Sequence, residues 1–162
     1  MRWIGFLLAT LLAATGCNKT CDELAEIEPV LEIGTGRQSF TDIEETTGFE
    51  KGPQNGFHMY GSVRARGLFG GDPLEIDDKT PTLTYTLNAV DGDLAGGFSG
   101  LQRQMVTLPD GTIERVGDLV ILETFEASDA EGVEIELFAE INDSCGRSAS
   151  AKASTTLSEG AF

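Results

Sequence analysis

The chain has 162 residues, of which 11 are Lys or Arg and 27 are Asp or Glu, so its formal net charge is −16 at pH 7. This length corresponds to one domain, and an apolar fraction of 40% is enough for a hydrophobic core. The excess of acid argues against a nucleic-acid partner and against electrostatic docking on anionic lipid, because both require clustered Lys and Arg.

The first seventeen residues have the pattern of an export signal. A positive start at residues 1–2 precedes an apolar run over residues 3–14, and the small residues Thr15 and Gly16 precede Cys17. The apolar run is too short for a membrane-spanning helix, which needs ~20 apolar residues. The pattern therefore predicts export of the chain.

Residues Ala14-Thr15-Gly16-Cys17 resemble the lipobox of bacterial lipoproteins, with Ala14 where that family usually has Leu. The resemblance implies a lipoprotein signal peptide over residues 1–16 and a mature chain whose first residue, Cys17, carries lipid. The implied location is the bacterial cell envelope, and Asn18 in place of Asp favours the outer membrane. The membrane is then a partner through the lipid on Cys17.

Two further cysteines, Cys21 and Cys145, remain when Cys17 carries lipid. Exported chains with an even number of cysteines commonly form disulfides, so we predict a Cys21–Cys145 bond. A zinc site is the alternative, but it requires about four ligands and only His58 is available to join the two cysteines.

The predicted elements begin with a polar tether over residues 17–29, which contains one helical turn and holds the fold clear of the lipid headgroups. From Val30 onward, short β-rich segments alternate with turns rich in Gly, Asp and Pro. A loop is expected over 69–81 and a tail over 159–162. Strands are expected over 30–33, 39–43, 57–68, 82–90, 101–108, 112–116, 119–125, 133–141 and 147–157.

This pattern predicts an all-β domain over residues 30–158, an antiparallel immunoglobulin-like β-sandwich of about 7–8 strands. Residues 82–90 and 133–141 alternate most clearly between apolar and polar side chains. The segment 119–125 is apolar on both faces at its start, which is typical of a central strand. Asp110-Gly111 predicts a hairpin between residues 101–108 and 112–116.

Residues Gly52–His58 and Val63–Leu68, together with Leu31–Gly36, resemble a group of uncharacterised surface lipoproteins from myxobacteria-like bacteria. That group pairs a GPQGG-aromatic-His turn with an alternating strand, and Asn55 here stands where the group usually has Gly. The resemblance implies a β-sandwich surface lipoprotein, and the group has no assigned activity that could be carried over.

The strand that follows this turn carries a candidate binding patch. Because side chains alternate along a strand, His58, Tyr60, Arg64 and Arg66 are expected on one face. Arg and Tyr are enriched at binding hot spots. The structural alternative has the His58 ring packing beside Tyr60 and the two arginines pairing with glutamates of the 133–141 strand: Glu134, Glu136 or Glu140. An exposed face favours a binding patch, whereas a covered face favours the structural alternative.

No catalytic motif is present in the sequence: it lacks a Gly-x-Ser-x-Gly elbow and a phosphate-binding loop. We expect no cofactor and no metal. Structural calcium is the alternative, and the acidic pairs that suit it are Asp77 with Asp78, Asp91 with Asp93, and Asp129 with Glu131. None of these pairs matches the EF-hand pattern.

The expected function is that of a membrane-anchored, non-enzymatic module that binds an envelope protein or glycan, or serves the envelope structurally. A carboxylate-based hydrolase and a metal-binding envelope protein are the alternatives. Two close carboxylates with raised pKa values in one concave site would favour the hydrolase.

Overall fold

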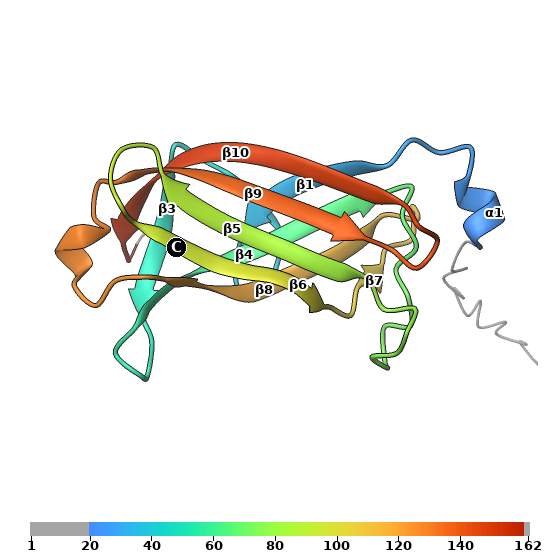
Figure 1. The fold of residues 1–162 in the computed structure, drawn as a ribbon, viewed down its shortest axis with the longest axis horizontal. Helices are drawn as coiled ribbons and strands as arrows, with labels where there is room; N and C mark the ends of the chain where they lie inside the picture. Colours follow the sequence, from blue (N-terminus) through green and yellow to red (C-terminus); the bar gives the residue numbers. More distant parts are fainter. Residues whose placement is uncertain (1–19, 161–162) are drawn as a thin grey trace, which may run out of the picture.

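The computed structural model describes residues 20–160, which form one short α-helix, one short 3-10 helix and ten strands (Figure 1). The predicted signal peptide and Cys17 lie outside the described residues, as do residues 161–162 of the predicted tail. The elements are α1 (Cys21–Leu24), β1 (Val30–Thr35), β2 (Thr41–Asp42), β3 (Thr46–Lys51), β4 (Phe57–Arg66), β5 (Thr82–Ala89), β6 (Ala95–Gln102), β7 (Val106–Thr107), β8 (Ile113–Leu122), η1 (Ala127–Asp129), β9 (Glu134–Asn142) and β10 (Ser148–Glu159).

The paired strands close into a barrel. One edge of β4 pairs with β8, while its other edge pairs with β3 at one end and with β1 at the other. From β3 the pairing continues through β10, β9, β5 and β6 back to β8. The predicted all-β class is confirmed. The immunoglobulin-like sandwich is not confirmed, because these pairings join all the layers into one closed sheet, and the β3–β10 pair is parallel.

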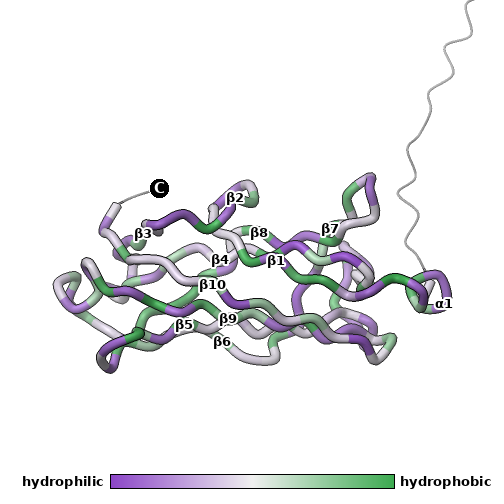
Figure 2. Tube along the Cα trace, turned by 90° about the horizontal axis from the view of Figure 1, so that it is seen from above, coloured by the Kyte–Doolittle hydropathy of each residue, from purple (hydrophilic) through white to green (hydrophobic). Residues whose placement is uncertain are grey.

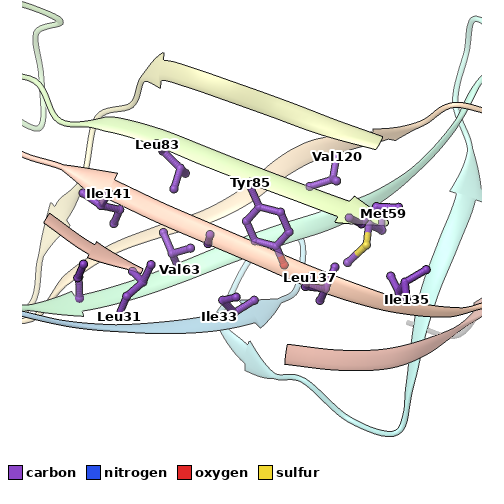
Figure 3. Packing of buried hydrophobic residues seen from close by; sticks show 14 of the residues in the cluster. Leu31, Ile33, Met59, Val63, Leu83, Tyr85, Val120, Ile135, Leu137 and Ile141 are labelled. Atoms are coloured by element: carbon purple, nitrogen blue, oxygen red, sulfur yellow. The ribbon is translucent and has the colours of Figure 1, made fainter. Parts of the chain in front are cut away.

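The core follows from the alternation of side chains along the strands. In β5 and β9, every second side chain points inward, and Leu83, Leu87, Ile135 and Leu137 are at most 2% exposed. Figure 3 shows Tyr85 between Leu83 and Leu137, and its hydroxyl donates a 3.1 Å hydrogen bond to the Gly34 carbonyl oxygen. Burial raises the pKa of the Tyr85 hydroxyl.

Several element boundaries differ from the predicted ones. β6 occupies Ala95–Gln102, where no strand was expected before residue 101, and β8 runs unbroken through the two segments predicted as 112–116 and 119–125. β8 pairs with β4 along one edge and with β6 and β7 along the other, which agrees with the predicted central strand, but Leu119 and Ile121 are each 50% exposed, so one face of the strand is open to solvent. β10 continues to Glu159, and the predicted tail is therefore partly strand.

The predicted tether is attached to the barrel from Thr20 onward. Thr20 caps α1 through a capping box with Glu23, and the Leu24 side chain is 3% exposed. The predicted disulfide is confirmed: Cys21 bonds Cys145 in the β9–β10 turn, with the Cα atoms 5.5 Å apart. The Arg147 guanidinium donates to the carbonyl oxygens of Leu24 and Ile27. Residues 20–29 of the predicted tether are therefore attached to the barrel.

Figures 1 and 2 both place α1 at one end of the long axis of the barrel. Within residues 20–160, no helix has the length and apolar character needed to cross a bilayer.

Candidate functional site

The predicted patch on β4 does not form one exposed face. His58 is 6% exposed and Tyr60 is 9% exposed. Cover comes in part from β3, which pairs with the start of β4 so that Glu50 lies opposite His58. For His58 and Tyr60 the structural alternative therefore holds: their rings pack edge to face with centroids 5.3 Å apart.

Glu50 connects these two rings. The Tyr60 hydroxyl donates a 2.8 Å hydrogen bond to Glu50 Oε1, and His58 Nε2 lies 3.3 Å from the same oxygen. The hydrogen bond from Tyr60 is the main reason that the pKa of Glu50 lies below its ordinary value, and the charges of His58 and Arg37 act in the same direction. The same hydrogen bond is the main reason that the pKa of Tyr60 is raised. Glu50 is therefore a carboxylate and Tyr60 a neutral phenol near neutral pH.

The β1–β2 hairpin lies beside this group. The Arg37 guanidinium lies over the Tyr60 ring at 5.6 Å from its centroid. The turn is fastened to the barrel by Ser62, whose hydroxyl donates a 3.1 Å hydrogen bond to the Gly36 carbonyl oxygen. Ser62 itself accepts a 3.3 Å hydrogen bond from the Gly117 amide of β8. Arg37 is thus carried on a turn that is bonded to Ser62 of β4, and Ser62 is in turn held by β8.

A cleft of about 450 Å³ opens between the hairpin and β3, and we name it the hairpin cleft. Most of the residues that line it carry a hydroxyl or a carboxylate, and Arg37 adds a guanidinium and Tyr60 a phenol, but apolar atoms form the larger part of the exposed wall. The lining residues are Thr35, Gly36, Arg37, Ser39, Thr41, Asp42, Glu44, Thr46, Thr47, Gly48, Glu50 and Tyr60. The cleft therefore combines hydrogen-bonding side chains with a larger apolar surface, and it is open to solvent on the side of the exposed residues Arg37, Ser39 and Thr46.

Arg64 and Arg66 line a separate and smaller cleft of about 220 Å³, between β1, the end of β4 and the β7–β8 turn. Arg64 forms an ion pair with Glu114 of β8, and its guanidinium lies 4.2 Å from the centroid of the Phe40 ring. The predicted pairing with Glu134, Glu136 or Glu140 is not observed for Arg64, because β9 pairs with β5 and β10 and not with β4. Glu136 pairs with Lys152 at 2.7 Å.

The four predicted residues are thus divided between two places. Tyr60 lines the hairpin cleft, whereas Arg64 and Arg66 line the smaller one, and Phe40 packs on Arg64 from the turn between β1 and β2. The sequence reasoning missed Arg37 and Glu50. The position of Glu50 could have been predicted from the sequence, because a hairpin turn over residues 52–56 places residue 50 opposite residue 58. The position of Arg37 could not, because it depends on packing between segments that are far apart in the chain.

Three of the acidic residues considered for calcium, Asp77, Asp129 and Glu131, accept hydrogen bonds within the protein. Asp77 Oδ1 accepts from the Lys79 amide at 2.9 Å, and Asp129 Oδ2 accepts from the Thr124 hydroxyl at 3.1 Å. Glu131 accepts a 2.6 Å hydrogen bond from the Glu159 amide. Between Thr20 and Gly160, no three His, Cys, Asp or Glu side chains come together in a group that could hold a metal ion.

Comparison with known proteins identifies no relative: no protein-family model matches the chain, and no curated protein or solved structure matches it either.

Proposed function

We propose that the mature chain is a lipid-anchored barrel of the bacterial cell envelope and that its hairpin cleft binds a hydroxyl-rich ligand, a glycan of that envelope, without converting it chemically. The observation that carries this proposal is the lining of the hairpin cleft. A sugar offers hydroxyl groups that both donate and accept hydrogen bonds, and the cleft supplies matching groups of both kinds.

Two polar groups of the cleft, the Glu50 carboxylate and the backbone that carries Arg37, are held in place before a ligand arrives. Glu50 is fixed by Tyr60 and His58, and Arg37 is positioned by the Ser62 bond to the neighbouring Gly36. Preorganised polar groups lose less conformational entropy when a ligand binds, which favours recognition of a small polar molecule. The phenol edge of Tyr60 adds the one aromatic surface of the cleft.

The electrostatics of the cleft favour binding over hydrolysis. A carboxylate-based hydrolase needs one carboxyl group with a raised pKa to act as the acid. In the hairpin cleft the pKa of Glu50 is lowered. Glu50 is therefore suited to accept hydrogen bonds from ligand hydroxyls and not to protonate a leaving group.

The anchor is proposed from sequence. Residues Ala14–Cys17 resemble a lipobox, and α1 begins at Cys21, four residues after Cys17. A lipid at Cys17 would keep the cleft near the envelope surface, where glycans are abundant.

Isothermal titration of the unlipidated chain, residues 18–162, with cell-wall oligosaccharides built on N-acetylhexosamine tests the proposal. We expect saturable binding that Arg37→Gln weakens about tenfold, as expected for loss of a charge-assisted hydrogen bond. Arg66→Gln, in the smaller cleft, is the matched control and should leave the affinity unchanged. Equal weakening by both variants, or no saturable binding to any fragment, would contradict the proposal.

A further inference from the structure

Two large apolar side chains are exposed in the loop between β4 and β5. Leu74 is 84% exposed and Ile76 is 59% exposed. The loop lies at the end of the barrel that carries α1, where Figure 1 draws it in green. Val106 in β7 and Leu101 near the end of β6, which are 58% and 41% exposed, belong to strands that reach the same end. Clustered exposed apolar side chains commonly mark a surface that contacts a partner or a membrane.

The loop is ordered by its own hydrogen bonds. The Leu74 amide donates to Asp72 Oδ1 at 2.8 Å, and the Asp77 amide donates to the Thr80 hydroxyl at 2.8 Å. The side-chain nitrogen of Gln102 on β6 donates to the Asp77 carbonyl oxygen at 2.7 Å. The loop therefore holds Leu74 and Ile76 outward in a defined conformation, and no further ordering is needed before they contact a surface.

This loop is fastened to the residues that follow Cys17. The Phe69 amide donates a 2.8 Å hydrogen bond to Asp143 Oδ2, and Asp143 Oδ1 accepts from the Cys145 amide at 2.9 Å. Cys145 is bonded to Cys21 of α1. The start of the loop and the start of the folded chain are therefore joined through one turn, the turn between β9 and β10.

The chain between Cys17 and Cys21 is short. Four residue steps span at most roughly 14 Å when fully extended. A lipid on Cys17 would therefore hold the Cys21–Cys145 bond within this distance of the bilayer surface. This limit on the distance rests on the proposed lipid anchor, and it holds because residues 20–29 are attached to the barrel.

We infer that the α1 end of the barrel faces the bilayer and that Leu74 and Ile76 enter its interfacial region. Acidic side chains surround them in the loop at Asp72, Glu75, Asp77 and Asp78, with only Lys79 of opposite sign. Anionic lipid would repel this loop, so the fitting surface is zwitterionic. The contact is driven by burial of apolar surface and oriented by the lipid on Cys17.

The test uses tryptophan fluorescence of the lipidated protein reconstituted in phosphatidylcholine vesicles. Trp3 is the one Trp in the chain and precedes Cys17, so Leu74→Trp makes a mature protein with a single indole. Phe125→Trp is the matched control, since Phe125 is 80% exposed and follows β8 at the opposite end of the barrel. Ile76→Trp is a second reporter in case Leu74→Trp impairs folding.

On vesicles, we expect the Leu74→Trp emission to shift to shorter wavelength and to be quenched by lipids that carry a nitroxide near the headgroup, while Phe125→Trp shows neither change. Replacing half of the lipid with phosphatidylglycerol should reduce the quenching. A Leu74→Trp signal identical to that of Phe125→Trp on protein that floats with the vesicles would overturn the inference and leave the anchor intact.

Two other outcomes would also overturn it. Lipid-free protein whose emission shifts as its concentration rises would show that a second copy of the chain, and not the membrane, covers Leu74 and Ile76. Protein that does not float with the vesicles would refute the anchor at Cys17 together with the inference that rests on it.

Discussion

The Tyr60 hydroxyl donates a 2.8 Å hydrogen bond to Glu50 across the hairpin of β3 and β4, and this bond shifts the two pKa values in opposite directions. A donor stabilises the charged form of the carboxylate, which lowers its pKa, and the phenol that donates resists losing its proton. The hairpin cleft therefore presents a fixed negative charge beside a neutral aromatic ring.

Removing this donor should raise the pKa of Glu50. In Tyr60→Phe, we expect the Glu50 carboxyl to titrate closer to its ordinary value of 4.5, as followed by the NMR shift of its side-chain carbonyl carbon. Tyr85→Phe is the control, because the Tyr85 hydroxyl bonds the Gly34 carbonyl oxygen and not Glu50. A Glu50 pKa that is the same in the wild type and in Tyr60→Phe would show that the bond is absent in solution.

The same hydrogen bond predicts part of the loss of folding stability at acidic pH. Because the folded pKa of Glu50 lies below the unfolded one, its contribution is complete above the ordinary value of 4.5 and is lost as the pH falls through the lowered folded value. Thermal unfolding between about pH 3 and pH 6 should therefore depend less on pH in Tyr60→Phe than in the wild type. An unchanged pH dependence in the variant would contradict this assignment.

The Cys21–Cys145 bond should stabilise the fold by restricting the unfolded chain. It joins residues 124 positions apart, and for loops of about this size the chain-entropy estimate is ~4.7 kcal/mol, usually offset in part by native strain. Replacing both cysteines with Ala should lower the free energy of unfolding by about 2–4 kcal/mol. Urea unfolding of both proteins, each carrying Cys17→Ser, measures the difference, and equal midpoints would contradict the prediction.

Gly61 should be intolerant of any side chain. A Cβ there would lie 2.8 Å from Val120 Cγ2 and 2.9 Å from the Tyr85 ring, in the centre of the core. Gly61→Ala should therefore destabilise the fold by about 1–3 kcal/mol through overpacking. Gly56→Ala is the matched control, because a Cβ at Gly56 meets no atom within 4 Å. Equal unfolding temperatures for the two variants would show that the core has room at Gly61.

Lipidation should depend on Cys17 alone among the three cysteines. When the chain is expressed in a bacterium supplied with a clickable fatty acid, we expect label on the wild type and on a variant with Cys21→Ser and Cys145→Ser. The Cys17→Ser variant should carry no label and leave the membrane fraction. A labelled or membrane-bound Cys17→Ser protein would refute the lipid anchor.

The sequence predicted the strands that alternate most clearly and missed β3 and β6, of which β6 has the clearer physical reason. Residues 82–90 and 133–141 alternate because one face of each strand is buried, and both predictions match β5 and β9 closely. β6 has Gly96-Gly97 in its interior, which lowers its strand propensity. Gly97 has φ +121°, and a Cβ there would lie 2.2 Å from the Tyr85 carbonyl oxygen. Close packing against β5 therefore requires Gly at this position, and this Gly is one reason that the strand could not be predicted from the sequence.

Only those parts of the candidate site that depend on residues close together in the sequence could be predicted. The turn over residues 52–56 and the packing of His58 on Tyr60 follow from hairpin geometry and strand alternation. The cover over these rings comes from β3, and the ring closure that places β3 between β4 and β10 depends on contacts more than 100 residues apart, such as Thr156 with Thr46. Patterns within a single segment carry no information about such contacts.

The most direct test of the account is a residue-resolved map of ligand binding on residues 18–162. Backbone amide shifts recorded during titration with an N-acetylhexosamine oligosaccharide should change along residues 35–50 and at Tyr60, with one saturation curve, and these changes should weaken in Arg37→Gln. Shifts that centre on Arg64 and Arg66, or no saturable shifts at all, would contradict a glycan-binding role for the hairpin cleft.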